Sequence, residues 1–193
     1  MKFINQKIGV FFWKLIIAFP VNFQNVLANI LFILLKNPNL KRNIFSRKNI
    51  DAAFPSLNEQ EKRKLLNENL KSMVHGIFDT GKAWFWNDSK INSLIKYEIF
   101  GLNKLIATKG NLLIFKHSHH LELDSRILGM HCELYGVERV HNSAFMQKVQ
   151  SMGRLKGLNA LADKNSPITF IKWLKKNKTV LYAIDQDYGL KNS

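Results

Sequence analysis

The sequence of 193 residues contains a single cysteine, Cys132. It therefore cannot form an intrachain disulfide, it lacks a cysteine-based zinc motif, and it suits a reducing compartment. It also contains no glycine-rich phosphate-binding loop, internal repeat or low-complexity tract. With 46% hydrophobic residues, the chain is long enough to bury one sizeable core, which argues against a disordered protein.

Acidic residues are scarce, and none of them precedes Asp51. The 29 lysines and arginines outnumber the 14 aspartates and glutamates, which gives a formal net charge of +15. The basic residues before Asp51 are Lys2, Lys7, Lys14, Lys36, Lys41, Arg42, Arg47 and Lys48. This excess indicates an anionic partner, which by charge alone is a nucleic acid, an acidic protein or a membrane rich in acidic lipid.

Long hydrophobic runs are missing as well, although the first part of the chain is the most apolar. Its two apolar runs, Ile8–Phe19 and Val26–Leu35, are separated by Pro20 and several amide side chains. Neither run reaches the roughly 20 apolar residues that a membrane-spanning helix needs. Two interfacial helices that bend at Pro20 would keep Trp13 and Lys14 at the level of the lipid headgroups.

These features divide the chain into three parts. Residues 1–36 are predicted to form membrane-anchoring or interfacial helices, with a single tilted span, a cleaved signal peptide and a buried helical hairpin as alternatives. Residues 37–57 are predicted to form a basic connector, and residues 58–193 the main domain.

Beyond residue 57 the pattern changes to alternating helices and strands. A long helix that Ser56 or Asn58 can cap is expected first, with apolar residues at helical spacing. The sequence then predicts strands at 97–100, 112–115, 134–140 and 179–184, a loop entering a helix at 118–132, and a helix at 166–178. Strands that alternate with helices predict an α/β fold with a mainly parallel sheet flanked by helices on both faces.

A histidine and a glutamate occur where reactive groups gather in α/β proteins, just beyond the carboxyl end of a strand. His117 follows the strand at 112–115, and Glu122 lies five positions later at the start of a helix. A turn into that helix can bring the carboxylate of Glu122 to one imidazole nitrogen of His117. His117 would then act as a general base on a hydroxyl, and Glu122 would orient it. The same pattern also fits a hydrogen-bonded loop histidine beside a helix-capping glutamate.

The neighbouring histidines permit a second interpretation. His117, His119 and His120 are residue types that ligate metals, and Glu122 and Asp124 lie beside them, as in a metal-dependent hydrolase. The segment departs from the H-x-H-x-D-H pattern of metallo-β-lactamases, because leucine and glutamate occupy its last two ligand positions. The metal site is therefore the weaker of the two hypotheses.

Several ordered segments carry a resemblance to a known family. The spacing of His117 and Glu122 fits the H-x4-[DE] motif of the lysophospholipid acyltransferase superfamily. The other matching segments are Asn49-Ile50 with Phe54-Pro55, Gly76-Ile77, Ala83-Trp84-Phe85-Trp86, Gly153-Arg154-Leu155-Lys156, Asp163-Lys164, and Tyr182 with Asp185-Gln186-Asp187-Tyr188-Gly189. Because they extend over nearly the whole chain, the sequence resembles the late acyltransferases of lipid A biosynthesis, the lauroyl and myristoyl acyltransferases.

The resemblance implies a glycerolipid acyltransferase-like fold and transfer of a fatty acyl chain from acyl-carrier protein to a hydroxyl of a lipid A precursor. The implied location is the cytoplasmic face of the bacterial inner membrane, and no cofactor is implied. His117 would be the general base and Glu122 its partner. The acidic carrier and the phosphates of the acceptor glycolipid fit the basic chain, whereas nucleic acid would leave the apolar runs without a role.

The resemblance also indicates four substrate-binding residues. Arg154 is expected to hold a phosphate or the developing oxyanion, and to serve the substrate rather than stability. Lys156 keeps a positive charge where the family often has arginine, but loses the bidentate fork. Asp185 and Asp187 follow the last strand and are expected to line the cleft as polar positioning groups. The alternatives are a solvated cation near a helix end for Arg154 and strand-end capping for the two aspartates.

Members of the family continue beyond the segment at 185–189 with further strands and helices, whereas this sequence ends at Ser193. The acyltransferase domain at 58–193 is therefore expected to be incomplete at its C-terminus. An inactive membrane-binding or carrier-binding remnant follows as an alternative function.

Overall fold

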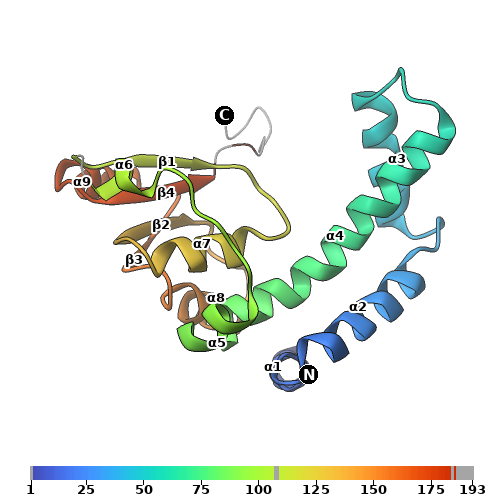
Figure 1. The fold of residues 1–193 in the computed structure, drawn as a ribbon, viewed down its shortest axis with the longest axis horizontal. Helices are drawn as coiled ribbons and strands as arrows, with labels where there is room; N and C mark the ends of the chain where they lie inside the picture. The colour runs from blue at the N-terminus through green and yellow to red at the C-terminus, as the bar shows by residue number, and fades with distance from the viewer. Residues whose placement is uncertain (1, 107–108, 184, 186–193) are drawn as a thin grey trace.

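A computed structural model describes residues 2–106, 109–183 and 185 (Figure 1). Its helices are α1 (Lys2–Ala18), α2 (Val21–Leu35), α3 (Lys41–Ala53), α4 (Glu59–Phe85), α5 (Asp88–Leu94), α6 (Leu102–Ile106), α7 (Leu121–Gly129), α8 (Ala144–Arg154) and α9 (Pro167–Lys175). Its strands are β1 (Leu112–Phe115), β2 (Leu134–Glu138), β3 (Ala160–Asp163) and β4 (Thr179–Ala183).

Helix α4 organises the helical part, and it begins at the predicted cap. The side chain of Asn58 accepts hydrogen bonds from the backbone N–H groups of Gln60 and Glu61, and the carboxylate of Glu61 accepts one from the backbone N–H of Asn58. This capping box pairs N–H groups that a helix start would otherwise leave unsatisfied. Helices α1, α2 and α3 pack against α4, and α3 occupies most of the predicted connector at 37–57 (Figure 1).

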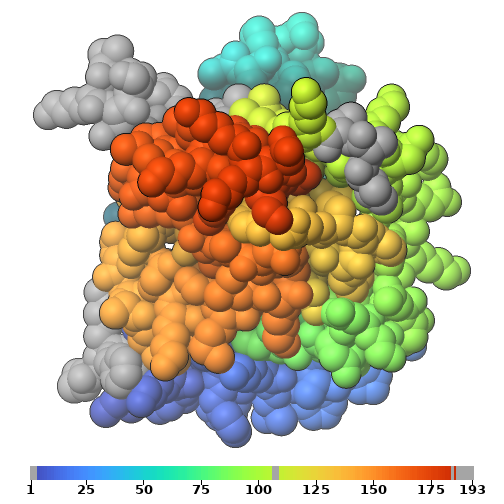
Figure 2. All heavy atoms as spheres, turned by 90° about the vertical axis from the view of Figure 1, so that its left-hand side faces the viewer, coloured from blue at the N-terminus to red at the C-terminus, as the bar shows by residue number. Residues whose placement is uncertain are grey.

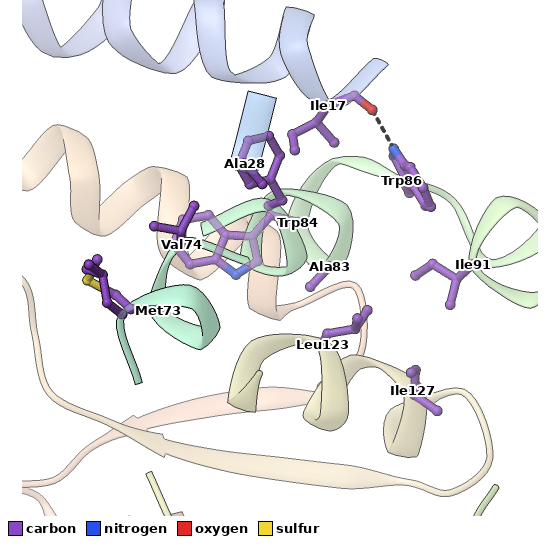
Figure 3. Packing of buried hydrophobic residues seen from close by; sticks show 12 residues of the cluster. Ile17, Ala28, Met73, Val74, Ala83, Trp84, Trp86, Ile91, Leu123 and Ile127 are labelled. Carbon is purple, nitrogen blue, oxygen red and sulfur yellow. Dashed lines mark hydrogen bonds between the residues drawn. The ribbon is translucent and has the colours of Figure 1, made fainter. Parts of the chain in front are cut away.

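The apolar core joins the N-terminal helices to α4 and α7. Ile17 of α1, Ala28 of α2 and Val74 of α4 are buried in one cluster, which also includes Leu123 of α7 (Figure 3). The indole N–H of Trp86 donates a hydrogen bond to the backbone carbonyl oxygen of Ile17, at 2.9 Å. Helices α1 and α2 are thus built into the folded body. Within the described ranges, no helix has the length and apolar character needed to cross a membrane.

The four strands of the described ranges form one parallel sheet in the order β1-β4-β2-β3, which confirms the predicted α/β fold. On one face, Leu134 and Leu181 are buried, and Leu128 of α7 packs against them. On the other face, the ring of Tyr135 packs on that of Trp173 in α9, with ring centroids 4.9 Å apart. Helices therefore cover both faces, as predicted.

Two local predictions differ from the structure. Residues 97–100 do show alternate half-buried and exposed side chains, but they pair with no strand in the described part of the chain. Tyr97 and Ile99 pack instead against the helical core, which accounts for the alternation, so the predicted strand was wrong. Strand β3 was not predicted. It pairs with β2 at one edge of the sheet, and its sequence, Ala-Leu-Ala-Asp, contains none of the β-branched or aromatic residues that mark strands.

Candidate active site

The sheet topology brings together two residues that the sequence places at separate strand ends. Strands β1 and β4 are parallel neighbours, with Phe115 opposite Ala183. His117 and Asp185 each lie two residues beyond that pair, at the carboxyl edge of the sheet. Nδ1 of His117 lies 2.5 Å from Oδ1 of Asp185, and the backbone N–H of His117 donates to Oδ2 at 2.9 Å. Asp185 therefore holds both the ring and the backbone of His117.

This contact selects the tautomer of a neutral His117 ring. The hydrogen bond from His117 lowers the pKa of Asp185 below its usual value, so the carboxylate is ionised at neutral pH. A carboxylate acceptor keeps the proton of a neutral ring on Nδ1, which leaves Nε2 as a proton acceptor. The His117 side chain is 32% exposed and lines a cavity of about 360 Å³ together with Arg139, Arg154 and Tyr182. A substrate hydroxyl can therefore reach the ring.

Glu122 does not make the predicted contact with His117. Its carboxylate accepts hydrogen bonds from the indole N–H of Trp84, at 2.8 Å, and from two nitrogens of Arg154, at 3.0 Å and 2.5 Å. Glu122 lies in the first turn of α7, and these partners belong to α4 and α8. A planar guanidinium and an indole N–H satisfy a largely buried carboxylate better than one imidazole can. The pairing predicted from spacing is therefore corrected to Glu122 with Arg154.

Arg154 is held by a second carboxylate, which the sequence analysis missed. One terminal nitrogen of Arg154 lies 2.8 Å from Oε2 of Glu138, the last residue of β2. The Glu138 side chain is only 6% exposed and accepts further hydrogen bonds from side chains of α8. Burial opposes the charge of Arg154, but the hydrogen bonds and charges of Glu122 and Glu138 outweigh it and raise the pKa of Arg154. Glu138 could have been recognised as a charged residue at the carboxyl end of a strand. The strand was predicted to extend to residue 140, which placed Glu138 inside it.

Glu138→Gln is expected to destabilise the fold by about 1.5–3 kcal/mol, because Arg154 loses a charged partner and a buried amide replaces an acceptor of four hydrogen bonds. Urea-induced unfolding measures the change. Glu133→Gln is the matched control, since Glu133 is 49% exposed and pairs with Lys178 at the surface, where an ion pair contributes about 0–1 kcal/mol. Equal unfolding midpoints for the two variants would contradict the role assigned to Glu138.

Of the other predicted substrate-binding residues, Lys156 is not brought to His117. Nζ of Lys156 donates a hydrogen bond to the backbone carbonyl oxygen of Trp86, at 3.2 Å, and lines a different cavity from the one beside His117. Asp187 lies outside the described residues. The substrate-binding roles of Arg154, Lys156, Asp185 and Asp187 therefore stay predictions.

The other histidines of the segment contact side chains of α4, and both lie near Ser72. Nδ1 of His119 lies 3.2 Å from Oγ of Ser72, and Nδ1 of His120 lies 2.6 Å from Oδ2 of Asp79. Among the described residues, no group of three His, Cys, Asp or Glu side chains is arranged to hold a metal ion. The structure therefore gives the metal-dependent hydrolase no support.

A parallel α/β sheet with a histidine–carboxylate pair beside a polar cavity defines a class of protein whose site can take a proton from a bound nucleophile. Comparison with known proteins then identifies the family. The profile of the bacterial lipid A biosynthesis acyltransferases matches residues 2–193, so the chain belongs to that family, as the resemblance predicted.

Curated relatives carry the same family name. The chain is 34% identical over 192 residues to a lipid A biosynthesis acyltransferase of Haemophilus influenzae, an alignment that covers 96% of this chain and 60% of the relative. It is 33% identical over 157 residues to the lipid A biosynthesis palmitoleoyltransferase of Escherichia coli, with coverage of 79% and 51%. For the lauroyltransferase of Escherichia coli, the identity is 35% over 150 residues, with coverage of 76% and 48%. The aligned region thus spans about half of each Escherichia coli relative and 60% of the Haemophilus influenzae one.

Proposed function

We propose that this chain moves a fatty acyl chain from acyl-carrier protein to a hydroxyl of a lipid A precursor. The observation that carries the proposal is the hydrogen bond between Nδ1 of His117 and Oδ1 of Asp185, at 2.5 Å, because it leaves Nε2 as the base. Membership of the lipid A biosynthesis acyltransferase family supports the choice of reaction. The relatives named as lauroyl and palmitoleoyl transferases support a fatty acyl group as the group transferred.

The proposed reaction needs a base and a group that stabilises the oxyanion, and the site offers a candidate for each. Nε2 of His117 takes the proton of the substrate hydroxyl as its oxygen attacks the thioester carbonyl carbon. The C–O bond forms, the C–S bond then breaks, and the imidazolium returns the proton to the leaving thiolate. Asp185 stabilises the imidazolium between these transfers. Arg154 lines the same cavity and is fixed by Glu122 and Glu138. The two carboxylates offset its charge, so its proposed role is that of a preorganised hydrogen-bond donor to the oxyanion or a substrate phosphate.

The surface of the N-terminal helices supports a location at the membrane surface. Exposed apolar side chains on α1 and α2 are Ile4, Ile8, Phe11, Phe12, Leu15, Phe23, Val26, Ile30, Ile33 and Leu34. No acidic residue precedes Asp51, so anionic headgroups meet no repulsion from side-chain carboxylates in this segment. The net charge of +15 likewise suits an acidic carrier protein and a phosphorylated acceptor. The proposed location is the cytoplasmic face of the bacterial inner membrane.

Acyl transfer is tested directly with purified chain, lauroyl-acyl-carrier protein and a phosphorylated, acylated glucosamine disaccharide. Mass spectrometry of the lipid fraction should show an acceptor that has gained one acyl chain, at a rate that excess EDTA leaves unchanged. Release of free fatty acid without an acylated acceptor would point to a hydrolase instead. A rate abolished by EDTA would contradict the proposed base mechanism.

Charged substitutions on the exposed faces of α1 and α2 are expected to release the chain from anionic vesicles. Phe11 and Ile33 are 63% and 68% exposed, so the double variant Phe11→Glu, Ile33→Glu should stay folded. Its binding to phosphatidylglycerol vesicles should fall about tenfold or more in a cosedimentation assay. Deleting residues 1–36 is a poorer test, because it removes Ile17 and Ala28 from the core.

Ile168→Glu is the matched control for vesicle binding, since Ile168 lies on α9 and is 67% exposed. It should bind vesicles almost as the parent does. Full release of the parent by salt alone would show that charge, and not apolar insertion, holds the chain at the surface. Unchanged binding of the double variant would refute the proposed membrane face.

A further inference from the structure

A second cavity, of about 370 Å³, lies among α1, the end of α4 and α8. Its lining is Lys14, Trp84, Phe85, Val149, Met152, Gly153 and Lys156. None of these residues lines the cavity beside His117. Figure 2 shows the N-terminal helices, in blue, beside the orange part of the chain that includes α8, and α1 and α8 are in contact. The volume lies within the range of pockets that hold small ligands.

The two charged residues of this cavity are both cations. Nζ of Lys14 lies 5.2 Å from the centroid of an aromatic ring, and Nζ of Lys156 donates a hydrogen bond to a backbone carbonyl oxygen. Within the described ranges, neither lysine forms an ion pair with a carboxylate. Burial and the charges of Arg126 and Lys14 lower the pKa of Lys156, against the opposing effect of Asp88. An anion between the two ammonium groups would relieve this repulsion.

The rest of the lining is apolar and adjoins the exposed face of α1. Trp84, Val149 and Met152 offer a surface that a hydrocarbon chain can cover, and Met152 is 63% exposed without such a cover. Lys14 follows the exposed Phe11 by three residues, so the two side chains lie on neighbouring parts of the same helix surface. A cavity with two cations and apolar walls at this position fits a molecule with an acidic head and a hydrocarbon chain.

We propose that this cavity binds an anionic amphiphile, with its acidic head between Lys14 and Lys156 and its chain against Trp84, Val149 and Met152. The site goes beyond the proposed acyl transfer, because it requires neither the base nor the acyl donor.

A ligand in this cavity would also contact Trp84, a side chain that binds Glu122 in the candidate active site. The indole N–H of Trp84 donates a hydrogen bond to Oε2 of Glu122, at 2.8 Å. Gly153 packs so closely on Trp84 that an added Cβ would lie 2.3 Å from its ring, and the next residue, Arg154, binds Glu122. An amphiphile against Trp84 therefore contacts the wall that positions Glu122.

Binding is measured by isothermal titration calorimetry with four probes and no acyl donor. Dihexanoylphosphatidylglycerol below its micellar concentration and octanoate are the anionic amphiphiles. Dihexanoylphosphatidylcholine tests the need for net charge, and inorganic phosphate tests the need for the chain. Both anionic amphiphiles should bind more tightly than the two comparison probes, and the tighter of the two identifies a phospholipid or a fatty acid as the source.

Variants then locate the binding site. Lys14→Ala and Lys156→Ala should each weaken binding of the anionic amphiphiles about tenfold, whereas Lys148→Ala, an exposed lysine on α8 outside the cavity, should not. Val149→Trp should block the cavity, with circular dichroism as the check that the variant is folded.

Three outcomes would overturn the site. They are equal binding of phosphatidylcholine, equal binding of inorganic phosphate, and equal loss of affinity in Lys148→Ala and the two cavity variants. Loss of acyl transfer in the same preparations would bear on the proposed function and not on this site, because the titrations contain no acyl donor.

Discussion

Replacing His117 with alanine is expected to lower the rate of acyl transfer about 10²–10⁴-fold, the usual contribution of a general base. The variant should stay folded, because the His117 side chain is 32% exposed and lies between β1 and α7. Initial rates with saturating acyl-carrier protein substrate measure the effect. His119→Ala is the matched control, since His119 contacts Ser72 on α4, and it should reduce the rate much less.

Double variants show whether Asp185 or Glu122 acts together with His117. Asp185→Asn should lower the rate of acyl transfer by a similar factor. Adding it to His117→Ala should lower the rate little further, because Asp185 acts through the His117 ring. Glu122→Gln should slow the His117→Ala variant further, because Glu122 acts on Arg154. The reverse pattern, with Glu122 coupled to His117 and Asp185 independent of it, would restore the pairing predicted from spacing.

Arg154→Ala is expected to destabilise the fold by about 3–5 kcal/mol, the cost of removing one partner from a buried ion pair. The substitution leaves the carboxylates of Glu122 and Glu138, which are 16% and 6% exposed, without the cation that bridges them. Urea-induced unfolding followed by circular dichroism gives the free energy. From the sequence alone, Arg154 was expected to serve the substrate and not stability. Because the guanidinium is paired with two carboxylates, the structure adds a stabilising role, while the role with substrate stays a prediction.

Arg47 provides the matched control, because its ion pair with Glu59 is exposed on both sides, at 47% and 59%. Arg47→Ala should change stability by about 1 kcal/mol or less. Arg154→Lys should retain part of the stability that Arg154→Ala loses. Lysine keeps the positive charge but cannot bridge two carboxylates with a planar fork. Unchanged stability of Arg154→Ala together with a large loss of transfer would return Arg154 to a role with substrate alone.

Local sequence patterns determined helices and strands, and with them the strand ends at which the reactive side chains lie. Asn58 followed by Glu61 is a capping box that any helix start can form, so the beginning of α4 was predictable. The apolar runs at 112–115 and 179–184 predicted strands β1 and β4, and therefore placed His117 and Asp185 just beyond strand ends. The family resemblance, now confirmed, rests on the same local segments.

Only the tertiary structure decided which of these groups meet. The sheet order places β4 beside β1, so the carboxylate that reaches His117 comes from 68 residues along the chain and not from Glu122. Glu122 is instead paired by the packing of α7 against α4 and α8, which brings Trp84 and Arg154 to its carboxylate. The physical reason is that residue spacing constrains contacts within a turn or helix. Contacts between elements depend on strand order and core packing, which arise from the whole chain.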